Sequence, residues 1–317
     1  MTPQLCCVCH EKSATRTLGG RPYCDDDYAH ATRENRGFVR SGLINLSLLV
    51  VFTLVVSALG AAMPLDLNQG QLLVVGLVLA LVPALLWLGF FYQQDRLEPE
   101  PHHFVAGVFL LALLVADVVG RRLLNDFFQT REWLSLDSTS ALIGYVLVVG
   151  FTLEAIKYAV VRFTVYPTRE FDERMDGIVY GTAAGLGVAT MLNVNFILDS
   201  GGAAISSGII YIVVTALAQG AFGGVVGYFL GEAKFVSEPF WWMPLGVTVA
   251  AVLNGLFSYF LAEVNQAGIT VSPWRGLLFA LLVAAITFAA LLYLIRRAIA
   301  QTLKTSAANT GTAPQGD

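Results

Sequence analysis

Charged residues are scarce in this 317-residue chain, which contains 19 Lys and Arg and 23 Asp and Glu, together 13% of the sequence. Hydrophobic residues make up 56%, and the mean hydropathy is +0.66. Water-soluble globular domains carry about 25% charged residues, so this composition excludes an ordinary soluble globule. The chain is predicted to be a membrane protein that crosses the bilayer several times.

Eight apolar runs are long enough for a helix to cross the hydrocarbon core, which takes about 20 residues. They are continuous and rich in Leu, Val, Ala and Gly, unlike the short alternating strands of an outer-membrane barrel. The predicted spans are 41–63, 70–92, 103–120, 138–161, 176–198, 204–231, 239–263 and 275–297. The expected fold class is an all-α polytopic membrane protein.

Basic residues in the short connections predict the orientation of the chain. With a cytoplasmic N-terminus, eleven of them lie inside and four outside. The inner set is Arg33, Arg36, Arg40, Arg96, Arg162, Arg169, Arg174, Lys234, Arg296, Arg297 and Lys304, and the outer set is Arg121, Arg122, Arg131 and Arg275. Both termini are therefore expected to be cytoplasmic, in an inner-membrane protein. Segment 121–137 is expected to be an outer loop or an amphipathic interfacial segment, and 299–317 a mostly disordered tail.

Cysteine is confined to the first 24 residues. Cys6 and Cys9 form a Cys-x2-Cys pair, and fourteen residues later Cys24 and Asp27 form a second pair with the same spacing. Two such pairs are typical of tetrahedral zinc, and a closed four-ligand site is structural. We expect residues 1–32 to be a zinc-binding module that resembles half of a LIM-type or treble-clef module, followed by a basic linker at 33–40.

Other ligands for this zinc are available in the same segment. Cys7 and His10 form another x2 pair, and His30 is an alternative to Asp27. The simplest competing interpretation is that the thiols are reduced and lie on a disordered tail. Disulfides are not expected on a cytoplasmic terminus.

Five separated stretches resemble the PrsW-type intramembrane metalloproteases in order and spacing, over roughly residues 75–297. They are FFYQQDRLEPEP (90–101), FTLEAIKY (151–158), RMDGIVYGTAAGLGVATMLNVNFIL (174–198), ALAQGAFGGVVGYFLG (216–231) and AAVLNGLFSYF (250–260). The resemblance implies a PrsW/CAAX-protease-like helix bundle over 41–298. It also implies an intramembrane zinc held by carboxylates and histidines that activates a water molecule.

The positions that the resemblance assigns to this metal site are mostly replaced. The paired-Glu motif reads Leu153 and Glu154, followed by Lys157. The Glu-Asn pair reads Leu192 and Asn193, and the two histidine positions read Gln219 and Asn254. All four histidines of the chain lie at or before position 103, so none lies deeper in a predicted span than its first residue. Amide oxygens are poor zinc ligands, so no intramembrane zinc and no catalytic residue is expected.

Glu154 and Lys157 are three residues apart and share a helical face. Unpaired charges in a bilayer are costly, so we expect an ion pair facing the bundle interior; the alternative is a residual polar pocket that recognises a substrate or partner. The resemblance implies that Asn193, Asn195, Gln219 and Asn254 lie where the family's ligands and their neighbours converge, and they are expected to join Glu154 in one hydrogen-bond network. Small residues at Gly181, Gly185, Gly223, Gly227 and Gly231 are expected to let two helices approach closely.

These observations predict a pseudoprotease, a scaffold or regulator in membrane signalling that binds transmembrane segments or a cytoplasmic partner without cutting them. One alternative is an active intramembrane peptidase acting on membrane proteins such as anti-sigma factors. A second is a small-molecule transporter that uses Asp117, Glu154 and the amides. The predicted spans contain no convincing facing pair of carboxylates for an aspartyl mechanism. Nothing in the sequence resembles a nucleic-acid-binding surface, so no nucleic acid partner is expected.

Overall fold

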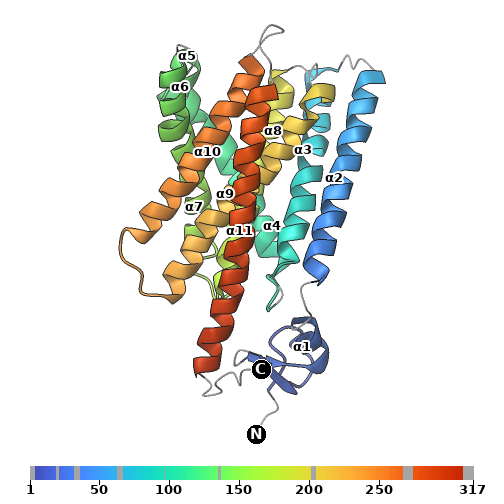
Figure 1. The fold of residues 1–317 in the computed structure, drawn as a ribbon, viewed down its shortest axis with the longest axis vertical. Helices are drawn as coiled ribbons and strands as arrows, with labels where there is room; N and C mark the ends of the chain where they lie inside the picture. Colours follow the sequence, from blue (N-terminus) through green and yellow to red (C-terminus); the bar gives the residue numbers. More distant parts are fainter. Residues whose placement is uncertain are drawn as a thin grey trace.

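The computed structural model describes residues 4–18, 21–31, 36–62, 67–95, 97–134, 137–200, 205–266 and 274–309. Within them, eight helical segments are long and apolar enough to cross a membrane. They are Arg40–Gly60, Gln69–Tyr92, His102–Phe127, Ser138–Phe163, Arg174–Asp199, Gly208–Phe235, Trp242–Ala262 and Leu278–Lys304. All eight predicted spans are confirmed, and the fold is an all-α polytopic bundle (Figure 1).

Six of the spans are single α-helices, and two are interrupted by π-helical turns. The single helices are α2 (Arg36–Ala62), α3 (Gln69–Tyr92), α8 (Arg174–Asp199), α9 (Ile205–Phe235), α10 (Trp242–Gln266) and α11 (Trp274–Asn309). The third span comprises α4 (His102–Val115), η1 (Ala116–Gly120) and η2 (Leu123–Phe127). The fourth comprises α6 (Ser138–Gly144), η3 (Tyr145–Gly150) and α7 (Phe151–Phe163). The short helix α5 (Thr130–Trp133) lies between them.

The third span differs from the predicted one, because the helix continues past residue 120 to Phe127. Arg121 tolerates this position because it pairs with Asp117 one turn earlier and donates a hydrogen bond to Asn195 of α8. The segment predicted as a loop therefore begins inside a helix. Similarly, α2 starts at Arg36 within the predicted linker, and α11 continues to Asn309 within the predicted tail.

Helices α8 and α9 form the centre of the bundle (Figure 1). In their most apolar windows 72% and 78% of the residues are buried, against 39% or less in the other spans. Glycines allow this close contact, as predicted. A Cβ atom added at Gly181 would lie 2.3 Å from the Gly223 carbonyl oxygen, and one at Gly227 would lie 1.8 Å from the Gly177 carbonyl oxygen. A larger residue at either position would force the two backbones apart.

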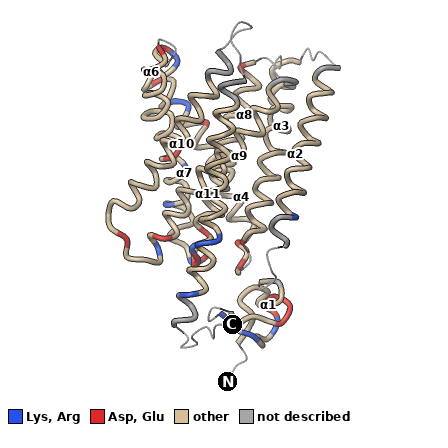
Figure 2. Tube along the Cα trace, viewed as in Figure 1, with Lys and Arg blue, Asp and Glu red and all other residues tan. Residues whose placement is uncertain are grey.

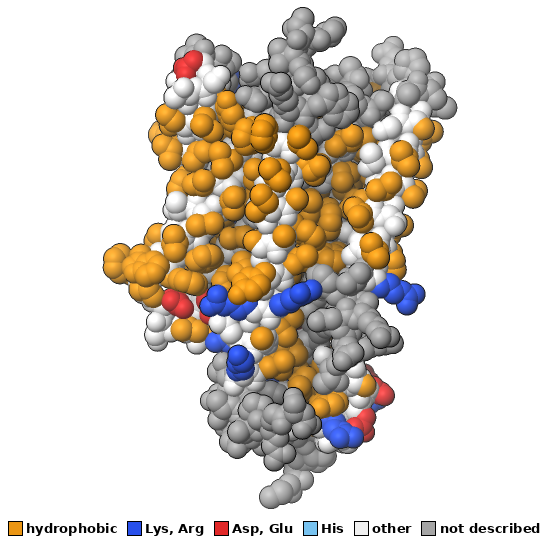
Figure 3. All heavy atoms as spheres, in the orientation of Figure 1, with side chains coloured by type: hydrophobic (Ala, Val, Ile, Leu, Met, Phe, Trp, Pro, Cys, Tyr) orange, Lys and Arg blue, Asp and Glu red, His pale blue; other side chains and the backbone are white. Residues whose placement is uncertain are grey.

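The face of the bundle seen in Figure 3 is covered by apolar side chains, as expected for a surface that contacts lipid. Lys and Arg side chains gather at one end of this apolar surface, the end next to the N-terminal module (Figures 2 and 3). The end of α11 lies at the same end of the molecule (Figure 1). We call this end the basic face after its Lys and Arg side chains; Asp and Glu side chains lie there as well (Figure 2).

The N-terminal module contains a two-stranded antiparallel sheet, β1 (Arg16–Leu18) and β2 (Arg21–Tyr23), followed by α1 (Asp25–Ala31). It lies against the segment that connects α3 to α4. The Tyr23 hydroxyl donates a 2.9 Å hydrogen bond to the Leu97 carbonyl oxygen, and Arg21 pairs with Glu98 and Glu173. The module is therefore anchored to the basic face of the bundle by specific polar contacts.

Candidate functional site

Four polar side chains from three helices meet inside the bundle, and we call them the intramembrane network: Glu154 and Lys157 of α7, Gln219 of α9 and Asn254 of α10. Lys157 Nζ donates to Glu154 Oε1 at 2.6 Å and to Gln219 Oε1 at 2.7 Å. Asn254 Nδ2 donates to Glu154 Oε1 at 2.6 Å, and Gln219 Nε2 donates to Asn254 Oδ1 at 2.9 Å. The predicted inward-facing ion pair is confirmed.

The intramembrane network is completely buried, because each of its four side chains has an exposed fraction of 0%. Its single carboxylate faces its single ammonium group, so its net charge is zero. Lys157 Nζ also lies 5.6 Å from the centre of the Phe222 ring, and Ser258 Oγ donates to Asn254 Oδ1 at 3.3 Å. Mutual hydrogen bonding among buried polar groups in lipid stabilises the helix packing. Glu154 Oε1 accepts two of these bonds, and Glu154 Oε2 is buried without a hydrogen-bond partner.

Asn193 and Asn195 do not join this network, so that part of the prediction is wrong. Asn193 Nδ2 donates to the Ile212 carbonyl oxygen at 3.0 Å, and Asn195 bonds to Arg121 and to Met191 Sδ. The reason is geometric. Ile212 precedes Gln219 by seven residues on α9, which is about two helical turns or 10 Å, so Asn193 meets α9 at a different level of the bundle.

The remaining positions of the expected metal site carry apolar side chains. Leu153 is buried in the main hydrophobic core, and Leu192 packs against that core. The amides of Gln219 and Asn254 are hydrogen-bonded to each other and to Glu154 and Lys157. One carboxylate and two mutually bonded amides do not match the carboxylate and imidazole ligands of a catalytic zinc. The residues present here do not fit that metal.

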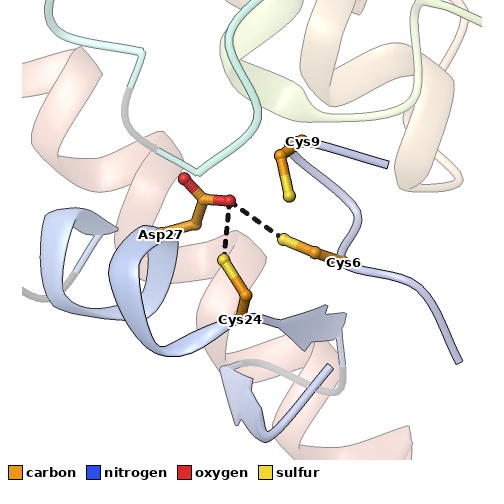
Figure 4. Close-up of side chains that lie close together, drawn as sticks. All are labelled: Cys6, Cys9, Cys24 and Asp27. Carbon is orange, nitrogen blue, oxygen red and sulfur yellow. Dashed lines mark hydrogen bonds between the residues drawn. The ribbon is translucent and has the colours of Figure 1, made fainter. Parts of the chain in front are cut away.

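The cysteine cluster has the geometry of a metal site (Figure 4). One donor atom from each of Cys6, Cys9, Cys24 and Asp27 lies within 4.8 Å of the others. Asp27 Oδ2 accepts from the Cys6 and Cys24 thiols, with S···O distances of 3.1 Å and 3.0 Å. Ligands of a tetrahedral zinc at about 2.3 Å lie roughly 3.5 to 4 Å apart, so a small adjustment would let these four side chains hold the ion.

Among the described residues, the competing ligands are not part of this cluster. Cys7 and His10 are absent from the group of four, and His10 is exposed on a left-handed backbone position with φ of 53°. The side chain of His30 lies outside the described residues. Asp27 is brought into the group by the first turn of α1, which starts directly after Cys24.

A second polar group lies where the α3–α4 connection meets the start of α8, and we call it the acidic cluster: Asp95, Glu100 and Asp176. One carboxylate oxygen of each lies within 4.8 Å of the others, and all three side chains are buried. Asp176 Oδ2 accepts from the backbone N–H groups of Asp172 and Glu173 at 2.6 Å each. Glu100 accepts a hydrogen bond from the Tyr180 hydroxyl. Both carboxylate oxygens of Asp95 lack a hydrogen-bond partner.

Electrostatics in the acidic cluster disfavour ionisation. Burial raises the pKa of Asp95 well above its usual range, and the neighbouring Glu173 and Glu100 carboxylates raise it further. Burial likewise raises the pKa of Glu100 to about 7. Burial also raises the pKa of Glu173 to about 7, although the Arg21 guanidinium opposes this rise. Arg21 therefore forms ion pairs with Glu98, Asp172 and Glu173, the carboxylates that lie beside the acidic cluster.

The acidic cluster was not predicted. Asp95 and Glu100 belong to the DRLEPEP motif and Asp176 to the RMDG motif, so each motif could be seen, but their contact could not. An even number of spans separates the two segments, which places them on the same side of the membrane. The number of spans predicts that both segments lie on the same side of the membrane, but it does not predict how close they are. The cluster supplies facing carboxylates at the edge of the bundle, where the sequence had offered no convincing pair.

Comparison with known proteins agrees with the resemblance seen in the motifs. The protein-family model described as PrsW family intramembrane metalloprotease matches residues 100–291. Protease PrsW of Bacillus subtilis (strain 168) is 26% identical over 188 residues, which cover 59% of this chain and 82% of that protein. Protease PrsW of Halalkalibacterium halodurans is 28% identical over 187 residues, covering 58% and 82%. No solved structure matches this chain.

Proposed function

Since the chain belongs to the PrsW family of intramembrane metalloproteases, and yet carries Leu192, Gln219 and Asn254 where we align the family's metal ligands, we propose that it is a pseudoprotease. In this proposal it binds transmembrane segments of partner proteins as a scaffold or regulator and does not cut them. The observation that carries the proposal is the intramembrane network, in which an acid, a base and two amides bond to one another.

Peptide hydrolysis by a metalloprotease needs a metal that lowers the pKa of a bound water and polarises the carbonyl group. The network offers Glu154 as its only carboxylate, and the ammonium group of Lys157 lies 2.6 Å from it. A cation at this distance competes with any metal for the same oxygen. The arrangement is suited to holding α7, α9 and α10 together.

The partner surface must lie elsewhere, because the network is completely buried. A shallow, open groove of about 510 Å³ lies on the π-helical part of the third span, lined by Val118, Val119, Arg122, Leu123, Asp126 and Phe127. Its apolar side chains suit contact with a helix in lipid, and Arg122 and Asp126 are able to bond a polar residue of that helix. Since π-helical turns are frequent at functional sites, this groove is our choice for the partner site.

The N-terminal module completes the proposal. Cys6, Cys9, Cys24 and Asp27 hold a structural Zn²⁺ that stabilises a segment too small to fold on its own core. The basic face of the bundle lies in the cytoplasm, which places the module there as well, in accord with the distribution of Lys and Arg. On this side the module is available to a cytoplasmic partner.

Site-specific photo-crosslinking tests the partner site. A photoreactive amino acid at Val119, in the groove, should capture a membrane protein, while the same group at Val51 should not, although Val51 of α2 is similarly exposed, at 56% against 44%. Equal capture from both positions would reject the groove. A cleaved membrane protein that accumulates with the wild-type chain, but not with Glu154→Gln, would reject the pseudoprotease and favour the active peptidase.

Metal analysis of the purified full chain tests the zinc module. We expect one zinc per chain, lost in Cys9→Ser and kept in the matched control Cys7→Ser. Loss of zinc in the Cys7 variant alone would show that the ligand set is wrong. Zinc retained by a chain that lacks residues 1–37 would place a zinc in the membrane domain and contradict the inactive-site argument.

A further inference from the structure

We infer that Asp95, Glu100 and Asp176 form a binding site for one hard divalent cation, Mg²⁺, Mn²⁺ or Ca²⁺, where the α3–α4 connection meets α8. Their nearest carboxylate oxygens lie within 4.8 Å of one another. Oxygens bound to one such ion at about 2.0 to 2.6 Å are at most roughly 4 to 5 Å apart. The three side chains are therefore placed to share a single ion.

The unpartnered oxygens of the cluster support this inference independently of its acidity. Asp95 is only 4% exposed, and neither of its carboxylate oxygens has a hydrogen-bond partner. Asp176 uses Oδ2 to accept two backbone N–H groups, and its Oδ1 is buried without a partner. Buried polar atoms in native proteins are almost always satisfied. A cation between Asp95 and Asp176 Oδ1 would satisfy all three of these oxygens together.

The charges around the cluster support the same conclusion. Arg21 pairs with Glu98, Asp172 and Glu173, which lie beside the cluster. Lys234 donates to two backbone carbonyl groups, at Tyr166 and Thr168. Lys234 is near enough to Asp176 and Glu100 to interact with them electrostatically, and Arg174 pairs with Glu232. Among the described residues, which do not include Arg96, the structure gives no Lys or Arg side chain a direct salt bridge to Asp95. Three carboxylates in a buried position need compensation, and a divalent cation would supply most of it.

The donor atoms indicate which cation would bind. All three ligands are carboxylate oxygens, which suit Mg²⁺, Mn²⁺ and Ca²⁺, whereas thiolates suit zinc. The chain thus separates two metals by ligand type, with zinc at the cysteine cluster and a hard cation at the acidic cluster. Because the cluster joins the α3–α4 connection to the first turn of α8, the ion would fix the surface on which Arg21 and Tyr23 anchor the N-terminal module.

The test uses the zinc-loaded full chain in detergent at pH 8, with Mn²⁺ as the probe. Electron paramagnetic resonance of free Mn²⁺ should show one saturable site per chain, and Mn²⁺ should raise the unfolding temperature. Asp95→Asn should weaken binding by about tenfold or more. Asp172→Asn is the matched control, because Asp172 lies beside the cluster but pairs with Arg21, and it should bind within about twofold of wild type.

Retained zinc and a cooperative unfolding transition establish that the Asp95 variant is folded. Arg96→Gln checks the one neighbouring cation outside the described residues, and it should bind Mn²⁺ at least as well as wild type. No saturable Mn²⁺ site in the wild-type chain would overturn the inference, as would equal binding by Asp95→Asn. Either result leaves the pseudoprotease proposal intact, because that proposal rests on the intramembrane network.

Discussion

Glu154 and Lys157 lie between helices in the middle of the bundle, whereas Asp95, Glu100 and Asp176 lie at its edge. An ammonium group pairs with the carboxylate of the first group, and in the part of the chain that the structure describes, which leaves out Arg96, no Lys or Arg forms a direct salt bridge with Asp95 of the second group. In the intramembrane network the ammonium group and the amide groups donate to Glu154 Oε1 and to the two amide oxygens, and Glu154 Oε2 is the one carboxylate oxygen of the network without a partner. In the acidic cluster three carboxylates meet with one hydroxyl and two backbone N–H groups as the donors that the described residues supply.

This difference indicates how the stability of each group should change when a ligand, a proton or a metal ion is added. A network that is neutral and largely hydrogen-bonded within itself gains little from an added ligand, and it loses stability when any member is removed. A group of like charges with unpartnered oxygens gains stability from a proton or a metal ion. Substitutions in the two groups are therefore expected to act in opposite directions, and this expectation can be tested.

The largest effect is expected from Lys157→Met, which leaves Glu154 buried without its counter-charge. Breaking one side of a buried ion pair costs about 3 to 5 kcal/mol. The unfolding temperature in detergent should fall sharply. The double variant Glu154→Gln, Lys157→Met is the control, because it removes both charges and should recover much of the loss. Equal losses in the single and double variants would mean that the pair contributes packing alone.

A smaller effect is expected from Arg21→Ala, which removes the guanidinium group that pairs with the carboxylates beside the acidic cluster. Glu173, whose side chain is 1% exposed, would lose its partner, and the contact of the module with the bundle should weaken by about 2 kcal/mol. Hydrogen exchange of residues 93–101 is the measurement, and protection there should decrease. Arg16→Ala is the matched control from the same module, since Arg16 pairs with Asp25 at the surface. Unchanged protection in the Arg21 variant would contradict the anchoring role.

Part of the intramembrane network is predictable, because the resemblance places Gln219 and Asn254 where the family's ligands converge and because charges inside a span need partners. Each span is set by about 20 apolar residues, and a charge inside such a span must find a partner among the few polar residues of the other spans. Glu154, Lys157, Gln219 and Asn254 meet these conditions. Asn193 and Asn195 were misplaced because an amide side chain is equally satisfied by a backbone carbonyl group or by a residue on another face.

The acidic cluster depends on contacts that periodicity does not encode. Asp95 and Asp176 are separated by two complete spans, and their approach depends on how α3, α4 and α8 pack. Arg21 and its partner Glu173 are also far apart in the sequence, so periodicity does not predict their ion pair. Polar side chains in the connections between spans are able to bond water or any of several neighbours, so the sequence does not predict which partner each one takes.

The smallest effect, and the one that distinguishes the two groups by sign, is the pH dependence of stability without added divalent cations. The pKa of Glu100 is raised from an ordinary 4.5 to about 7 in the folded protein. Its protonated form therefore stabilises the fold fully below pH about 4.5, and this contribution is lost as the pH rises through about 7. Between pH 6 and pH 8 the loss amounts to about 1 kcal/mol. Glu173 acts in the same direction, because its pKa is also about 7.

Glu100→Gln should remove the part of this pH dependence that belongs to Glu100, leaving the part that belongs to Glu173. Urea unfolding of the detergent-solubilised chain at pH 6, 7 and 8 is the measurement, and Glu132→Gln, at an exposed carboxyl group of α5, is the control. Mn²⁺ added at pH 8 should restore the stability that the wild-type chain loses, but should not do so in Glu100→Gln. A stability that rises from pH 6 to pH 8 would contradict the assignment, because it would mean that Glu100 is stabilised as an anion, as a carboxylate with its own permanent counter-charge would be.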